Sequence, residues 1–247
     1  MKLKKWEDLP CQMQIPEVRP YYEMLEKKRF SLILKRLFDI AASAALLVVL
    51  LPFFALLSVI IKLDSPGSVF YRQERVTQYG RIFRIHKFRT MVQGADKGSQ
   101  VTVNNDCRIT RVGKIIRDFR IDELAQLIDV LAGDLTLVGV RPESVFYARQ
   151  YTPVMLATLL LPAGVTSIAS IYYKDEARLL DGAEDTDKVY IEKILPEKMY
   201  YNLKGVEQFS FTGDIKILFM TVFAVLGKEY KPDFAGASEK NEEFEHE

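Results

Sequence analysis

The 247-residue chain has few of the side chains on which several kinds of catalytic site depend. It contains two histidines, His86 and His246, which leave little for a histidine-based metal site or a Ser-His-Asp triad. Its two cysteines, Cys11 and Cys107, form no metal-binding or disulfide pattern and fit a reducing cytosolic setting. There is no glycine-rich phosphate loop of the Walker or Rossmann kind. Carboxylates and basic side chains therefore remain as the candidates for chemistry.

Charge is missing from one long stretch, residues 40–61, which holds 22 residues. As a helix it would be about 33 Å long, close to the thickness of the hydrocarbon core of a bilayer. A buried core helix of a soluble protein is disfavoured at this length. The stretch lies far from Met1 and behind several basic residues, which argues against a cleavable signal peptide.

The two flanks of this stretch are both basic, and Pro52 lies near its middle. Basic flanks favour the cytoplasmic side of a membrane at both ends, and a central proline removes a helical hydrogen bond. We therefore predict that residues 35–64 form a re-entrant membrane helix, with a single span as the alternative.

Basic residues are concentrated between residues 68 and 120, which hold twelve Lys or Arg against four Asp or Glu. Such a cluster suits anionic lipid head groups, nucleic acid or a phosphorylated substrate. Nucleic acid is disfavoured, because aromatic stacking residues are not interleaved as in known modules. Within this region, residues 69–89 predict two strands, and Phe83, Ile85 and Lys87 would share one face of the second.

Two adjacent carboxylates, Asp122 and Glu123, follow the basic region. Apolar residues behind them recur at helical spacing and predict a helix that Gly133 would end. This apolar stripe consists of Leu124, Leu127, Ile128 and Leu131. An acidic first turn of a helix would explain a lone pair of acids. With cations beside them, the two carboxylates also suit a complex of Mg²⁺, or Mn²⁺, with a pyrophosphate.

Two further helices are predicted near the end of the chain. Residues 196–209 begin with a proline at a favourable position and direct Met199, Leu203 and Val206 inward. The next helix would begin at Thr212 and is too short to span a bilayer. It would lie either on the membrane surface or against the core, with an apolar face formed by Ile215, Leu218, Phe219, Val222 and Val225 or Leu226.

Several motifs then occur in one order along the chain. They are KRLFD at 35–39, SPGSVFYRQERV at 65–76, FRIHKFRTM at 83–91, DCRITRVGKIIRDFRIDELAQL at 106–127 and GDLTLVGVRPE at 133–143. With the proline-containing apolar helix, they make the chain from Lys35 to about Lys228 resemble the bacterial sugar transferase family. These are monotopic polyprenyl-phosphate phosphoglycosyl transferases.

The resemblance implies an α/β fold, a small helix-rich cytosolic catalytic domain on a re-entrant membrane helix with amphipathic interfacial helices. It implies transfer of a phosphosugar from a UDP-sugar to undecaprenyl phosphate with release of UMP. This step would initiate glycan assembly at the cytoplasmic face of the bacterial inner membrane, ahead of downstream glycosyltransferases. The expected division is an extension of unassigned role (1–34), the membrane helix (35–64), the catalytic domain (65–230) and a disordered acidic tail (231–247).

The resemblance also assigns roles to individual residues. Asp122 matches the family's nucleophile, which becomes a phosphosugar ester, and Glu123 matches the second acid, which acts with Mg²⁺. Both acids are therefore candidate metal ligands. The basic residues expected to hold phosphate oxygens are Lys87, Arg117 and Arg141, with Arg89 as a weaker candidate.

Departures from the family pattern leave alternatives open. Leu51 precedes Pro52 where a serine is common, and Thr77, Ala125 and Val140 replace a glycine and two prolines. Residues 162–170 keep Gly164 and Thr166 but lack the arginine, tryptophan and glutamine of the family's RPGITGWAQ. An altered nucleotide-sugar pocket is one consequence. The competing functions are a non-catalytic membrane-bound partner in glycan assembly and a basic anchor protein for acidic lipid or nucleic acid.

Overall fold

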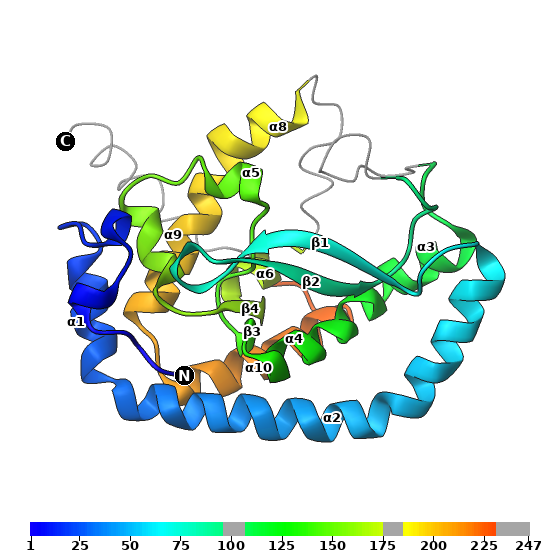
Figure 1. Ribbon diagram of the computed structural model, residues 1–247, viewed down its shortest axis with the longest axis horizontal. Helices are drawn as coiled ribbons and strands as arrows, with labels where there is room; N and C mark the ends of the chain where they lie inside the picture. Colours follow the sequence, from blue (N-terminus) through cyan, green and yellow to red (C-terminus); the bar gives the residue numbers. More distant parts are fainter. Residues whose placement is uncertain (96–106, 175–184, 231–247) are drawn as a thin grey trace.

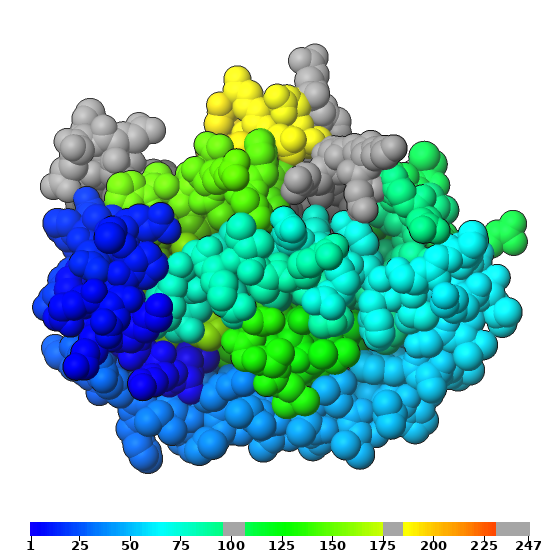
Figure 2. Space-filling model, viewed as in Figure 1, coloured from blue at the N-terminus to red at the C-terminus, as the bar shows by residue number. Residues whose placement is uncertain are grey.

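A computed structural model describes residues 1–95, 107–174 and 185–230. A 36-residue helix, α2 (Arg29–Asp64), lies beneath the other labelled elements and curves along its length (Figure 1). Its side chains form the lower edge of the molecule in the space-filling view (Figure 2). The acidic tail expected over 231–247 lies outside the described residues.

Helix α2 has one face toward the protein and a wide apolar face toward the outside. The inward face repeats at helical spacing and consists of Leu32, Lys35, Asp39, Ser43, Phe54, Leu57 and Ile61. The outward face includes well-exposed Val48, Val49 and Leu51. Within the described ranges, α2 is the one helix whose length and composition would allow it to cross a membrane. Pro52 lies inside a helix that continues on both sides of it, so the bend occurs without a break in the helix.

Charged side chains of the KRLFD motif fasten α2 to three other elements. Lys35 Nζ lies 2.6 Å from Asp214 Oδ2 of α10 (Phe211–Val225). Asp39 accepts hydrogen bonds from Thr136 Oγ1 at 2.6 Å and from the Leu137 backbone N–H at 3.3 Å, both in β3 (Leu135–Val138). Arg36 donates to backbone carbonyls at the C-terminal end of α4 (Leu127–Ala132), where cations are favourable.

The predicted strands form an antiparallel hairpin of β1 (Phe70–Val76) and β2 (Ile82–Phe88). Phe83 and Ile85 are buried against α4 and β3, as the alternating pattern predicts, and Lys87 continues the same face. The His86 backbone N–H donates to Asp129 Oδ2 of α4 at 2.8 Å, which fixes the hairpin over that helix. The strand therefore delivers Lys87 to the side of the hairpin where the acid pair lies.

Thr77, which stands in place of the family's glycine, makes two contacts at the hairpin turn. Its hydroxyl donates to the Asp134 carbonyl at 2.6 Å and accepts from the Ala163 backbone N–H at 3.1 Å. The turn is thereby tied to the starts of β3 and β4 (Ala163–Thr166). The threonine hydroxyl thus satisfies two buried backbone groups that glycine would leave to other partners.

Strands β3 and β4 are parallel neighbours, and the segment that follows β3 comes very close to β4. The Gly139 backbone N–H donates to the Thr166 carbonyl, and that of Gly164 to the Val140 carbonyl. A Cβ atom on Gly164 would lie 2.1 Å from the Gly139 nitrogen, so no side chain fits there. This close approach places Arg141 beside the segment 162–170.

The N-terminal residues, which had no predicted role, contribute to the main hydrophobic core. This part of the chain forms two 3₁₀ turns (Trp6–Asp8 and Cys11–Met13) and α1 (Arg19–Lys27). The buried residues are Met13 of the second turn, Val18 just before α1, and Tyr22 and Leu25 of α1. These side chains pack with residues of a 3₁₀ helix (Val154–Leu160) and of α9 (Leu195–Glu207). The remaining short helices are α3 (Arg111–Asp118), α5 (Val145–Ala148), α6 (Ile168–Tyr172), α8 (Thr186–Val189) and a π-helix (Tyr190–Ile194).

The two predicted C-terminal helices are confirmed as α9 and α10. Met199 and Val206 of α9 are buried, and Leu203 packs partly against the core. In α10, Leu218 packs against the core while Phe219, Val222 and Leu226 are well exposed. The expected apolar face is therefore divided. Its exposed part favours the membrane-surface alternative over a helix that only faces the core.

Candidate active site

The acid pair occurs on a short 3₁₀ helix (Ile121–Gln126) between α3 and α4. Arg120 precedes it in a left-handed conformation (φ 53°), so the chain turns sharply before the acids. Asp122 and Glu123 lie in the first turn, as predicted, but that turn is 3₁₀ instead of α-helical. Gly133 ends α4 with φ 91°, which confirms the predicted end of the helix.

One part of the predicted apolar stripe is wrong. Leu127 is buried, whereas Leu131 is 37% exposed and Val130 occupies the core position instead. A 3₁₀ segment has three residues per turn and an α-helix has 3.6. The side chains after the 3₁₀ segment therefore point in other directions than a continuous α-helix predicts. Counting from Leu124 at an α-helical period therefore assigns the wrong residue to the last turn.

Glu123 is enclosed by two cations that come from distant parts of the chain. Lys87 Nζ of β2 lies 3.1 Å from Glu123 Oε1, and Arg141 Nη1 lies 3.0 Å from Oε2. The second Arg141 nitrogen also donates to Oε1, which makes the contact bidentate. Burial alone would raise the pKa of Glu123, but Arg141 and Lys87 outweigh it and hold that pKa well below the usual value. Glu123 is therefore an ionised carboxylate with both oxygens engaged.

Asp122 is much less well paired. Its nearest cation among the described residues is Lys87, with Nζ 4.0 Å from Asp122 Oδ2, and its side chain is 15% exposed. Burial raises the pKa of Asp122 and the charge of Glu123 adds to this, while Lys87, Arg117 and Arg141 oppose it. Burial likewise lowers the pKa of Lys87, although both acids act in the opposite direction. The site thus holds a carboxylate whose negative charge is only partly compensated.

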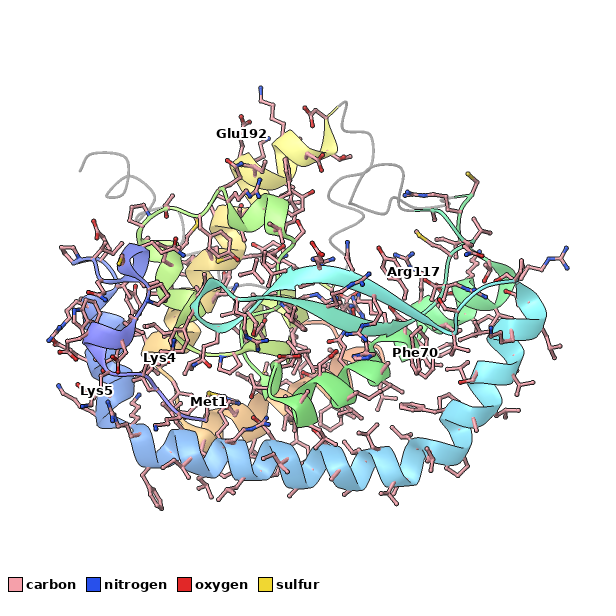
Figure 3. The ribbon with its side chains drawn as sticks, in the orientation of Figure 1. Met1, Lys4, Lys5, Phe70, Arg117 and Glu192 are labelled. Atoms are coloured by element: carbon pink, nitrogen blue, oxygen red, sulfur yellow. The ribbon has the colours of Figure 1, made fainter. Side chains whose placement is uncertain are left out.

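A cavity of about 580 Å³ opens on the Asp122 side of this cluster. Its basic lining residues come from the hairpin, the segment after it and α3; they are Arg72, Arg75, Arg84, Lys87, Arg89, Arg108 and Arg117. Figure 3 shows Arg117 at the end of α3 beside the hairpin. Asp122 and Glu74 are the acids among those lining residues that belong to the described part of the chain. Such a cavity suits a polyanion that must come close to one carboxylate.

Three of the predicted site residues therefore surround the acid pair, and a fourth has a second role. Lys87 and Arg141 contact Glu123, and Arg117 lines the cavity with Asp122. Arg89 also lines the cavity, but its guanidinium donates to the Ser65 carbonyl at 2.6 Å and the Pro66 carbonyl at 2.9 Å. It thus holds the turn that follows α2, and its assignment to a substrate stays a prediction.

Sequence reasoning missed Arg72, Arg75, Arg84 and Arg108 as site residues. Arg72 and Arg84 belong to strands that form opposite halves of the hairpin, and both line the cavity. The alternation along each strand could have identified residues on a shared face, but not which face borders a cavity. The sequence therefore identified these four arginines only as members of a basic region.

A second, smaller cavity of about 230 Å³ lies on the Glu123 and Arg141 side. Its lining includes Val165, Thr166 and Ser170, which belong to the segment that departs from the family pattern. These departures were expected to alter a nucleotide-sugar pocket. The structure places the lining residues of that segment beside the second cavity, and none of them among the described residues of the basic cavity.

The part of the chain that the structure describes brings together no group of three or more His, Cys, Asp or Glu side chains suited to a metal ion. The adjacent carboxylates nevertheless fit Mg²⁺ in kind, because this ion is commonly held by one or two carboxylates together with substrate phosphates. Asp122 has the more available oxygens, since both Glu123 oxygens accept from cations.

A sequence model described as "Bacterial sugar transferase" matches residues 30–228. This covers most of the chain, and the protein belongs to the bacterial sugar transferase family. The match begins at the second residue of α2 and ends shortly after α10, so it includes the acid pair and every cation named above.

Curated proteins show the same relationship. The UDP-N-acetylgalactosamine-undecaprenyl-phosphate N-acetylgalactosaminephosphotransferase of Aeromonas hydrophila is 36% identical over 197 residues, 78% of this chain and 44% of that protein. The UDP-glucose:undecaprenyl-phosphate glucose-1-phosphate transferase of Klebsiella pneumoniae is 32% identical over 78% of this chain and 40% of its own length. The chain therefore spans less than half of these two relatives. The exopolysaccharide production protein PSS of Rhizobium leguminosarum is 35% identical over 79% of this chain and 96% of its length.

Proposed function

We propose that this protein transfers a sugar 1-phosphate from a UDP-sugar to undecaprenyl phosphate and releases UMP. The reaction would initiate assembly of a glycan at the cytoplasmic face of the bacterial inner membrane. The observation that carries the proposal is the incompletely paired Asp122 carboxylate at one end of a cation-lined cavity. The printed names of the relatives, which act on UDP-sugars and undecaprenyl phosphate, agree with it.

The first step would form a covalent intermediate. An Asp122 carboxylate oxygen attacks the phosphorus that carries the sugar, the bond between this phosphorus and the bridging oxygen breaks, and UMP leaves with that electron pair. In its ionised form Asp122 attacks without a general base, because a carboxylate is itself a nucleophile. Lys87 and Arg117 are positioned to stabilise the charge on the phosphoryl oxygens.

The second step would return the enzyme to its starting state. A phosphate oxygen of the acceptor attacks the phosphorus of the Asp122 ester, the ester bond breaks, and the sugar-diphospho-lipid leaves. Glu123 holds Lys87 and Arg141 in place through both steps. Mg²⁺, bound by Asp122 or Glu123 with the diphosphate, would supply positive charge that lets two anions approach.

We further infer that α2 is re-entrant, with both ends on the cytoplasmic side. Support comes from its curvature around a sequence that contains Pro52 and from KRLFD contacts that hold its first half against the catalytic elements. Single cysteines at Ser31 and Ser68, in a background without Cys11 and Cys107, should both be protected from a periplasmic thiol reagent. Periplasmic labelling of Ser31 alone would establish a span.

The test of the proposed function is the intact mass of the protein after mixing with UDP-sugars in the absence of lipid. We expect release of UMP and a mass increase of one phosphosugar, located on the peptide that contains Asp122. The non-catalytic alternative predicts neither. The names of the relatives, which are transferases, agree with the catalytic function and not with that alternative.

A further inference from the structure

The second cavity differs in chemistry from the basic one, although both reach the acid pair. Its walls are formed by apolar side chains from the 3₁₀ helix, α4, β4, α6 and α10; they include Leu124, Leu127, Val165, Ile171 and Val225. A polar UDP-sugar would gain little from such walls, whereas an alkyl or isoprenoid chain would be favourably buried.

Basic side chains also line this cavity. Among the residues that the structure describes, its lining contains Arg120, Arg141 and Lys174 and one carboxylate, that of Glu123. Arg120 donates to the Lys174 carbonyl, so the start of the 3₁₀ helix and the segment after α6 are held together. Apolar walls combined with cationic side chains are complementary to an amphiphile with one anionic head group.

The position of the cavity also suits an occupant that comes from a bilayer. Ala224 and Val225 of α10 line it, while Phe219, Val222 and Leu226 of the same helix form an exposed apolar face. Phe119, which also lines the cavity, is itself well exposed. Apolar surface of this kind is typical of a helix that lies in a membrane interface.

We propose that this cavity receives the acceptor lipid. The phosphate lies at the Arg141 side of the acid pair, and the isoprenoid units nearest to it lie between the 3₁₀ helix, α6 and α10. Donor and acceptor then reach the acid pair through separate cavities, the first lined by Asp122 and the second by Glu123. This assignment rests on the proposed function for the identity of the lipid. It also gives the 162–170 segment a role in accepting lipid, with small Ser170 leaving room where the family pattern has glutamine.

A photo-crosslinking experiment tests the location without requiring catalysis. The full chain in lipid nanodiscs is irradiated with farnesyl phosphate that carries a diazirine on its first isoprene unit. We expect labelled peptides that contain residues 165–174 or 218–226, with labelling reduced by undecaprenyl phosphate and unchanged by UDP-sugar. The corresponding farnesol probe, which lacks the phosphate, should label these peptides at least about tenfold less. Labelling confined to α2, or equal labelling by the alcohol, overturns the assignment.

Substitutions separate the two steps of the reaction. Ser170→Phe places a phenyl ring in the cavity and should reduce lipid-dependent turnover at least about tenfold more than it reduces adduct formation without lipid. Thr152→Phe, at an exposed position outside both cavities, is the matched control and should leave both rates near wild type. Ala224→Leu serves as a second cavity variant should Ser170→Phe fail to fold. Equal reduction of both steps, or no reduction, contradicts the assignment.

The two experiments distinguish the cavity assignment from the proposed function. Wild-type protein that is labelled in the cavity but forms no phosphosugar adduct would contradict the function and retain a lipid phosphate site. Protein that turns over normally but is labelled elsewhere would retain the function and contradict the site.

Discussion

Two of the regions in which this protein buries charge do so in opposite ways. At the α2 anchor, Lys35 and Asp39 are 3% and 1% exposed, and each has a partner at 2.6 Å. At the acid pair, Glu123 engages two cations while Asp122 has its nearest cation at 4.0 Å. Burial raises the pKa of Asp214 at the anchor as it does that of Asp122, but Asp214 keeps the close contact with Lys35.

The comparison distinguishes the buried charges at the α2 anchor, which stabilise the fold, from the Asp122 carboxylate, which can react. A buried ion with close partners is costly to disturb, because removing one partner leaves the other without compensation. A buried carboxylate with weak pairing is less stable as an ion, and forming an ester removes its charge. Substitutions at the anchor should therefore affect stability, and substitutions at the acid pair should affect turnover.

The largest effect is expected for Asp122→Asn. The amide is neutral and a poor nucleophile, so turnover and the phosphosugar adduct should disappear together. Stability should be unchanged or slightly increased, because a raised pKa means that folding disfavours the ionised form of this side chain. UMP release, intact mass and thermal unfolding measure the three quantities. Unchanged turnover, or an adduct on another residue, would contradict the role of Asp122.

Loss of the surrounding cations should have the next largest effect. Lys87→Ala, Arg117→Ala and Arg141→Ala should each lower kcat/KM by a factor on the order of 10² or more. Lys87 and Arg141 share Glu123, so their double variant should lose less than the product of the two single losses. Arg81→Ala removes an exposed ion pair with Asp134 and is the matched control, with kcat/KM expected near wild type. If Arg81→Ala lowered kcat/KM as much as Lys87→Ala, the losses would reflect the removal of positive charge in general and not a contact specific to the site.

At the anchor, Asp39→Ala should lower the free energy of unfolding by about 3 kcal/mol, since it leaves the Thr136 hydroxyl and the Leu137 backbone N–H without an acceptor. Asp39→Asn keeps an acceptor oxygen and should cost less. Urea unfolding in a fixed detergent measures both. Similar losses for the two variants would show that the charge of Asp39 matters more than its hydrogen bonds.

The local structure was largely predictable from sequence, because its signals are local. Alternation predicted both strands of the hairpin, and a proline followed by apolar residues at helical spacing predicted α9. Gly133 was identified as the end of α4 for the same reason. The error at Leu131 arose where a 3₁₀ segment changed the helical period, which no residue in that stretch signals.

The pairing of charges was not predictable, because it depends on contacts between distant segments. Asp39 meets Thr136 across 97 positions, and Lys87 meets Glu123 across 36. The resemblance to the family placed Lys87, Arg117 and Arg141 near the acids, but it did not distinguish the well-paired acid from the poorly paired one. The second cavity was missed altogether, since its walls come from elements that lie far apart in the sequence, from the 3₁₀ helix to α10.

The smallest expected effect, and the most direct test of the unequal pairing, is a shift in pH dependence. Asp122 must be ionised to attack, so the rate of adduct formation should fall toward acid pH, with a midpoint above the ordinary aspartate pKa of about 4. Burial is the main cause of that raised pKa and Glu123 adds to it.

In Glu123→Gln the neighbouring negative charge is gone, while Lys87 and Arg141 lose their partner and still act on Asp122. Both changes lower the pKa of Asp122, so the acid limb should move to lower pH even though the maximum rate falls, with part of that rate recovered by higher Mg²⁺. Lys87→Met removes the nearest cation and should move the limb in the opposite direction. Stopped-flow measurement of UMP release without lipid, between about pH 4 and pH 7, gives the midpoints. An acid limb that stays in place in both variants would mean that another group controls the rate and that the charges around Asp122 do not tune its reactivity.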